Sequence, residues 1–105
     1  MNLIQQHISS INHLCRQYRV KELYAYGSVT DSELFTPQSD VDLIVKFKEE
    51  VPVEAYADLY FDLAESLEEV LHRKVDLMTD KPIQNRILKA HIEASKQQIY
   101  AAWSY

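Results

Sequence analysis

This chain of 105 residues contains one glycine, Gly27. Glycine is the residue that adopts a positive φ freely and lets the backbone approach another group closely, so a single glycine marks a position with a special backbone requirement. Gly27 follows residues 22–26, an apolar run that predicts a short strand, and it precedes Ser28. A strand that ends in Gly-Ser and leads into a helical turn predicts a loop that could hold a phosphate.

A pair of alternate carboxylates follows this loop. Asp40 and Asp42 open a predicted strand over residues 40–47, which is rich in Val, Leu, Ile and Phe. Side chains two residues apart on a strand point to the same face, so these carboxylates would repel each other unless a cation lies between them. Asp76 has the matching place in another predicted strand, residues 74–78. If the two strands are neighbours, three carboxylates converge in a way that suits Mg²⁺ bound together with phosphates.

The remaining pattern predicts helices between these strands. Apolar spacing predicts a helix over residues 3–18 with Asn2 as its N-cap, one helical turn over 30–34, and a helix from Pro52 to residue 72. A last helix is expected to start at Asp80 and to run toward Tyr100. We therefore expect an α/β chain, an α+β sandwich in which helices pack on a small mixed sheet of about three strands. Residues 1–105 are expected to form a single domain.

Composition excludes several classes of protein. The formal net charge is −5, from 16 acidic and 11 basic residues, and no basic stripe is present, which argues against binding to duplex nucleic acid. No apolar run approaches the ~20 residues of a membrane span, and no secretory signal is recognisable. The lone Cys15 cannot form an internal disulfide, so a reducing cytoplasm is expected.

Other motifs for metal or phosphate binding are not matched. An EF-hand loop starting at Asp40 would need glycine where Val45 stands, and the chain has no P-loop. Four histidines lack zinc-ligand spacing, and each is expected on a helix surface: His7, His13, His72 and His91.

Each site motif also has an ordinary structural explanation. Gly-Ser after a strand is usually a simple turn, Asp-x-Asp is common on solvated strands, and Asp76 could cap a bend or pair with Lys74. It is the combination of all three motifs at this spacing that favours a functional site.

The pattern Gly27-Ser28, eleven residues, then Asp40-Val41-Asp42 resembles the DNA polymerase β-like nucleotidyltransferase superfamily, and within it the minimal nucleotidyltransferases. The resemblance covers nearly the whole chain, including Asp76. It implies that Gly27 and Ser28 bind the triphosphate and that Asp40, Asp42 and Asp76 hold two Mg²⁺ ions. It also implies that Asp76 helps to activate an incoming hydroxyl.

The resemblance further implies a reaction and a partner. The reaction would transfer AMP from ATP to a hydroxyl and release pyrophosphate. Minimal members commonly pair with a helical HEPN-type toxin and act as its antitoxin, in known cases by adding AMP to a partner tyrosine. An enzyme of this kind is therefore the leading hypothesis.

Two departures from the family pattern keep a second hypothesis open. Asp31 and Ser32 stand where members usually have arginine and glycine, and the spacer is one residue longer than usual. Lys46, on the same strand face as Asp42, could supply part of the missing positive charge. The alternative is a binding module that has lost productive triphosphate binding and neutralises its partner by contact, with residues 100–105 as a candidate interface. A transferase acting on a small molecule is a third option, which the lack of a second domain disfavours.

Overall fold

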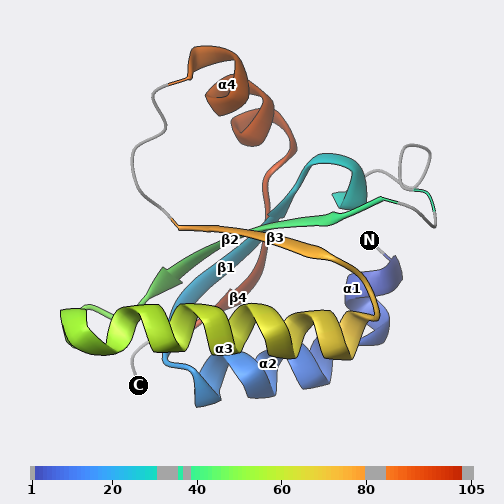
Figure 1. The fold of residues 1–105 in the computed structure, drawn as a ribbon. Helices are drawn as coiled ribbons and strands as arrows, with labels where there is room; N and C mark the ends of the chain where they lie inside the picture. The colour runs from blue at the N-terminus through green and yellow to red at the C-terminus, as the bar shows by residue number, and fades with distance from the viewer. Residues whose placement is uncertain (1, 31–35, 37–38, 80–84, 103–105) are drawn as a thin grey trace.

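The computed structural model describes residues 2–30, 36, 39–79 and 85–102 (Figure 1). In chain order the described helices and strands are α1 Asn2–Gln6, α2 Ile8–Gln17, β1 Val20–Tyr26, the short 3₁₀ helix η1 Gly27–Thr30, β2 Val41–Phe47, α3 Val53–Leu71, β3 Val75–Thr79, α4 Arg86–Ser95 and β4 Gln97–Ala101. None of the helices in this part of the chain is long and apolar enough to span a membrane.

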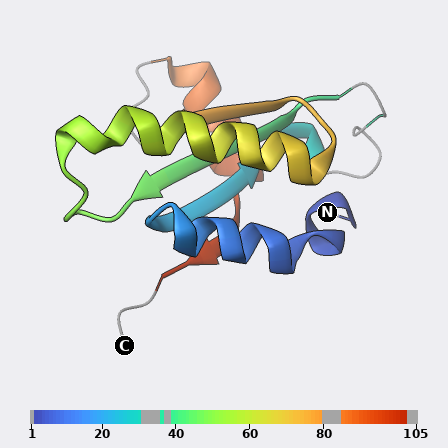
Figure 2. The same ribbon diagram turned by 60° about the horizontal axis from the view of Figure 1, so that its bottom comes forward.

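The strands form one mixed sheet in the order β3-β2-β1-β4. β1 pairs antiparallel with β2 and with β4, whereas β2 and β3 are parallel. The parallel pair requires a crossover, and the 19-residue helix α3 provides it. Figure 2 shows α3 and α2 packed next to each other on the same side of the sheet. The expected α+β architecture, in which helices pack on a small mixed sheet, is confirmed.

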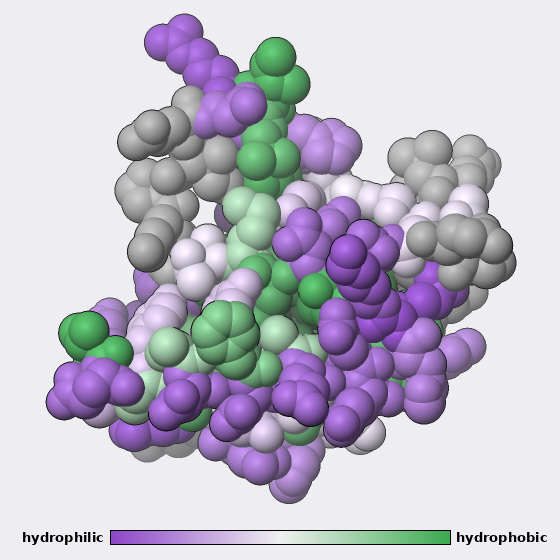
Figure 3. Space-filling model, viewed as in Figure 1, coloured by the Kyte–Doolittle hydropathy of each residue, from purple (hydrophilic) through white to green (hydrophobic). Residues whose placement is uncertain are grey.

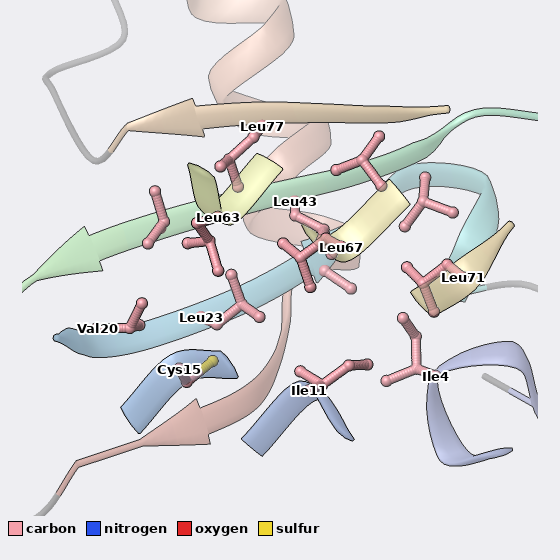
Figure 4. Close-up of a cluster of buried hydrophobic side chains, with 14 of the residues drawn as sticks. Ile4, Ile11, Cys15, Val20, Leu23, Leu43, Leu63, Leu67, Leu71 and Leu77 are labelled. Atoms are coloured by element: carbon pink, nitrogen blue, oxygen red, sulfur yellow. The ribbon is translucent and has the colours of Figure 1, made fainter. Parts of the chain in front are cut away.

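The main core lies between the sheet and helices α2 and α3. Strand residues that point to this face alternate with residues that point away, as the period of a strand requires. Figure 4 shows the buried side chains of the helices meeting those of the sheet. Those with no more than 2% exposure include Ile4, Ile11, Cys15, Val20, Leu23, Leu43, Leu63, Leu67 and Leu71.

Helix α4 covers part of the opposite face of the sheet (Figure 1). A smaller cluster holds it there, in which Ile92 packs with Tyr26 and Ile44. Tyr24, Met78 and Leu88 surround this cluster and are partly buried. The two faces of the sheet thus differ. One carries the main core, and the other carries α4 together with Asp42 and Asp76.

The single N-terminal helix expected over residues 3–18 is two helices. α1 ends at Gln6 and α2 begins at Ile8, with His7 between them at φ −115° and ψ 17°. The His7 N–H donates to the Ile4 carbonyl, 3.1 Å away, which is a tighter turn than an α-helix makes. This break changes the direction of the chain, and both Ile4 and Ile11 become buried in the same core.

The last helix is shorter than expected and a fourth strand follows it. α4 ends at Ser95, Lys96 takes an extended ψ of 128°, and residues 97–101 pair with β1. Without β4, one edge of β1 would present unpaired backbone groups, and a strand that covers them outweighs the helical spacing of this segment. Asn85 caps α4, its side chain accepting from the N–H groups of residues 87 and 88.

Two further expectations fall partly on residues outside the described ones. Asp80, the expected N-cap of the last helix, lies outside them. So does most of the helical turn expected over residues 30–34, and the described turn of 3₁₀ helix comes earlier, at residues 27–30.

Candidate active site

Gly27 directly follows β1 and begins η1. Its φ is +74°, the left-handed conformation that favours glycine. A methyl group at this position would lie 3.0 Å from Asp42 Oδ2, tighter than most side-chain contacts, and 4.0 Å from His91 Nε2. Both reasons for which a glycine was expected here, a positive φ and a close approach, are therefore present. The Thr30 hydroxyl donates to the Gly27 carbonyl, 2.7 Å away, and closes the turn that contains Ser28.

The parallel pairing of β2 and β3 places Asp42 directly opposite Asp76. On its other side Asp42 is opposite Tyr26 of β1. Asp42 is half-buried, whereas Asp76 is exposed, and Asp40 is exposed immediately before β2. The neighbouring strands thus bring together two of the three predicted carboxylates at the end of β1 where Gly27 lies.

Arg73 fixes the chain just before these carboxylates. Its guanidinium donates to the carbonyl oxygens of Thr36 and Ser39, at 3.0 and 3.1 Å. The Ser39 hydroxyl in turn accepts from the Thr36 N–H, 3.0 Å away. The turn that leads into Asp40 is therefore tied to the end of the α3–β3 connection.

Electrostatic effects also connect these side chains. The pKa of Asp42 is raised, first by burial and then by the negative charges of Asp76 and Asp40, while His91 opposes the shift. Burial, followed by the charges of Asp42 and Asp76, raises the pKa of Tyr26 to about 12. The Tyr26 hydroxyl is therefore neutral near pH 7 and donates to the Met78 sulfur, 3.0 Å away. Negative charges that crowd one another in this way are stabilised when a cation binds between them.

The donor set fits a hard divalent cation. Asp42 and Asp76 supply carboxylate oxygens from adjacent strands, and oxygen is the ligand that Mg²⁺ prefers. Across residues 2–30, 36, 39–79 and 85–102, no three His, Cys, Asp or Glu side chains lie close enough together to form a metal site by themselves. Substrate phosphates commonly complete the coordination of Mg²⁺, so a set of few protein ligands agrees with such a site.

Helix α4 brings two residues to Gly27 that the sequence pattern did not single out. The Gly27 N–H donates to Ser95 Oγ, 3.0 Å away, and the same hydroxyl donates to the His91 carbonyl, 2.9 Å away. His91 is exposed on a helix, as expected, but its imidazole is directed toward Gly27 and Asp42. No local motif marks these residues, because the way α4 packs decides which of its side chains face the loop.

Two other residues were considered from the sequence, and the structure describes one of them, Lys46. Asp31 lies outside the described residues. Lys46 is opposite Glu22 in the register. It stands four residues along β2 from Asp42, or about 13 Å at the usual rise of a strand.

Comparison with known proteins identifies the family. The model of the family "Polymerase beta, Nucleotidyltransferase" matches residues 9–103. The chain belongs to this nucleotidyltransferase family. A relative from Methanocaldococcus jannaschii that is named as a protein adenylyltransferase is 39% identical over 77 residues, which are 73% of this chain and 74% of the relative. A second relative from the same organism, named in the same way, is 35% identical over 80 residues, 76% of each chain.

Solved structures show the same fold for this nucleotidyltransferase. A minimal nucleotidyltransferase superposes with a TM-score of 0.63 at 23% identity, over 90% of both chains. A toxin–antitoxin crystal structure with AMP-PNP gives 0.65 at 21% identity, over 90% of this chain and 73% of the other. A Shewanella oneidensis complex of a tri-AMPylated HEPN toxin with an MNT antitoxin gives 0.61 at 19% identity, over 93% and 72%.

Proposed function

We propose that this nucleotidyltransferase transfers AMP from ATP to a hydroxyl of a helical HEPN-type protein partner, a tyrosine in the leading case, and thereby acts as the antitoxin of that partner. The observation that carries the proposal is the position of Asp42, opposite Asp76 across a parallel strand pair and against Gly27. Protein adenylyltransferase relatives and the AMPylated HEPN complex of similar fold support the choice of substrate and partner.

Each site residue has a role in this proposal. Gly27 and Ser28 hold the triphosphate, and Asp40, Asp42 and Asp76 hold Mg²⁺, two ions in the leading case. When bound, Mg²⁺ neutralises charge on the phosphates and makes the α-phosphorus more electrophilic. Asp76 is exposed at the edge of the sheet, where it can accept the proton of an incoming hydroxyl.

The reaction is an in-line displacement at the α-phosphorus. The acceptor oxygen forms a bond to the α-phosphorus, the bond from the α-phosphorus to the bridging oxygen breaks, and pyrophosphate leaves. The acceptor proton passes to a base, the role assigned to Asp76. In this proposal the partner protein supplies the acceptor hydroxyl. ATP as the substrate and the unpaired, buried Cys15 both agree with a cytoplasmic setting.

The substitution Asp42→Asn tests this function. It keeps the shape of the side chain but removes its charge, so we expect at least a hundredfold less AMP transfer with the fold intact. The measurement is transfer of labelled AMP from ATP to a co-purified HEPN partner with Mg²⁺ present, with circular dichroism to check folding. His13→Ala, an exposed change on α2, is the control. Normal transfer by the Asp42→Asn protein would contradict the proposal.

Neutralisation by contact alone is the second candidate function. The observation that favours it is the acidic Asp31 and uncharged Ser32 in the sequence just after the Gly-Ser turn, close to where a polyanion would bind. A double Asp40→Asn, Asp42→Asn variant separates the two. Full neutralisation of the partner by this variant would favour contact, and loss of neutralisation would favour AMP transfer.

A further inference from the structure

The segment that links the two motifs of the site has no basic residue. From Gly27 to Asp42 the sequence contains no lysine or arginine, but it contains four acidic residues: Asp31, Glu33, Asp40 and Asp42. Ser28 and the other hydroxyl side chains of this segment can donate hydrogen bonds to a triphosphate that binds beside it, but none carries a positive charge. A basic or imidazole donor must come from another element of the fold.

Helix α4 is the element that reaches this place. Ile92 is 2% exposed and packs against Tyr26 and Ile44, which fixes the rotation of the helix on the sheet. Residues 91 and 95 are one turn apart on an α-helix and share a face. Ser95 binds the Gly27 N–H, so this shared face is the one that meets the glycine turn.

The imidazole of His91 lies on that face. Its Nε2 and Asp42 Oδ2 are both within 4.0 Å of the point that a Gly27 side chain would occupy. The His91 carbonyl also accepts from the Ser95 hydroxyl, 2.9 Å away, which ties its backbone to the same contact. The imidazole therefore stands at the open space that the absence of a side chain on Gly27 creates. It carries an N–H donor whether it is neutral or charged.

We propose that His91 is a nucleotide-binding residue that donates a hydrogen bond to the phosphates of the substrate, in the place where the Gly27–Asp42 segment offers no basic side chain. The inference rests on the proposed function, because it requires that ATP binds at Gly27 and Asp42. It adds α4 to the elements that form the phosphate site, next to the glycine turn and β2.

Binding of two probes in the presence of Mg²⁺ tests the role of His91. The first is α,β-methylene ATP, which the reaction cannot cleave, measured by titration calorimetry. The second is inorganic pyrophosphate, which has phosphates but no base or sugar, measured by displacement of the first. A hydrogen bond to a charged group is worth roughly a factor of ten or more in affinity. His91→Ala should therefore lower the affinity for each probe about tenfold.

Two matched variants accompany this measurement. His91→Gln keeps an N–H donor and should stay within about threefold of the wild-type affinity, given the strength of one such bond. His13→Ala removes an exposed histidine from α2, on the other side of the sheet, and should leave both affinities unchanged. The unliganded melting temperatures of these variants should match the wild type, because each site is exposed.

The outcomes separate this inference from the proposed function. If the wild type binds both probes, Asp42→Asn does not, and His91→Ala binds as the wild type does, the role of His91 is overturned and the proposed function stands. If His91→Ala lowers the affinity for α,β-methylene ATP but not for pyrophosphate, His91 contacts the base or sugar, and the proposed phosphate contact is overturned. No binding by the wild type would overturn both.

Discussion

At the scale of single residues, Gly27 and Asp42 constrain each other. The positive φ of Gly27 sets the direction of the turn, and the missing side chain leaves the space into which the Asp42 carboxylate extends. Asp42 cannot move away easily, because Tyr26 and Asp76 flank it in the sheet. The position of a candidate metal ligand therefore depends on the absence of a side chain on a neighbouring strand end.

Gly27→Ala should destabilise the protein by about 1–2 kcal/mol, the usual cost of a left-handed conformation for a residue with a side chain. The new methyl group would also lie 3.0 Å from Asp42 Oδ2, so the carboxylate has to shift. The measurement is the free energy of unfolding in urea.

Asp42→Ala supplies the control for this prediction. It removes the carboxylate, so Gly27→Ala should cost less in that background than in the wild type. An equal cost in both backgrounds would show that the contact with Asp42 contributes nothing, and that only the φ angle matters.

At the scale of elements, α4 is the α-helix that contacts the glycine turn of the site, and Ile92 is its one fully buried side chain. A few buried side chains hold it to the sheet, and Ser95 ties its end to the glycine turn. Figure 3 shows apolar surface on α4 at the top of the molecule, away from the sheet. Ile87, at 84% exposure, is the large apolar side chain of this helix that points to solvent.

Two isoleucines on α4 allow a matched comparison. Ile92→Ala should cost about 2–5 kcal/mol of unfolding free energy, since it empties the cluster with Tyr26 and Ile44. Ile87→Ala makes the same chemical change at an exposed position and should stay within about 0.5 kcal/mol of the wild type. Urea unfolding of both variants tests this. Similar costs for the two changes would mean that α4 is not anchored through Ile92.

At the scale of the whole molecule, the two faces of the sheet do different work. The face under α2 and α3 carries the continuous core that includes Cys15, whereas the face under α4 carries Asp42 and Asp76 at its end. The core face stabilises the fold, and the other face positions the candidate site carboxylates, Asp42 and Asp76. We expect residues 1–105 to unfold as one cooperative unit, because the main core joins both helices to the central strands.

The reactivity of Cys15 reports on this cooperativity. Burial raises the pKa of its thiol from the ordinary 9.0 to about 12, so the folded protein should resist alkylation at pH 8. Labelling should follow the same urea transition as circular dichroism. Rapid labelling below that transition would show that α2 opens separately from the sheet.

The same shift makes the stability depend on pH. The folded pKa lies above the unfolded one, so the folded state holds the proton more tightly. The contribution of the thiol is complete below pH 9 and is lost as the pH rises from about 9 toward 12. A Cys15→Ala variant lacks this titration, so its stability should fall less over that interval.

Local spacing in the sequence was enough to predict several features of this protein. The alternation of Asp40 and Asp42, the run after Lys74 that contains Asp76, and the lone glycine after a strand all depend on neighbouring residues. So does the apolar periodicity of α3. The resemblance to the nucleotidyltransferase family came from the order and spacing of these motifs along the chain, and the family comparison confirms it. The local features could be predicted because the periods of strands and helices fix which nearby side chains share a face.

Only the tertiary structure decided the rest. β4 exists because β1 has an edge that a later segment can pair with, and His7 interrupts the first helix so that Ile4 and Ile11 reach one core. His91 reaches the glycine turn because Ile92 and Ser95 anchor α4 on the sheet. The free energy of such contacts comes from residues far apart in the chain. Local sequence therefore determined what each segment could form, and packing between distant segments decided where each one ends and which side chains meet.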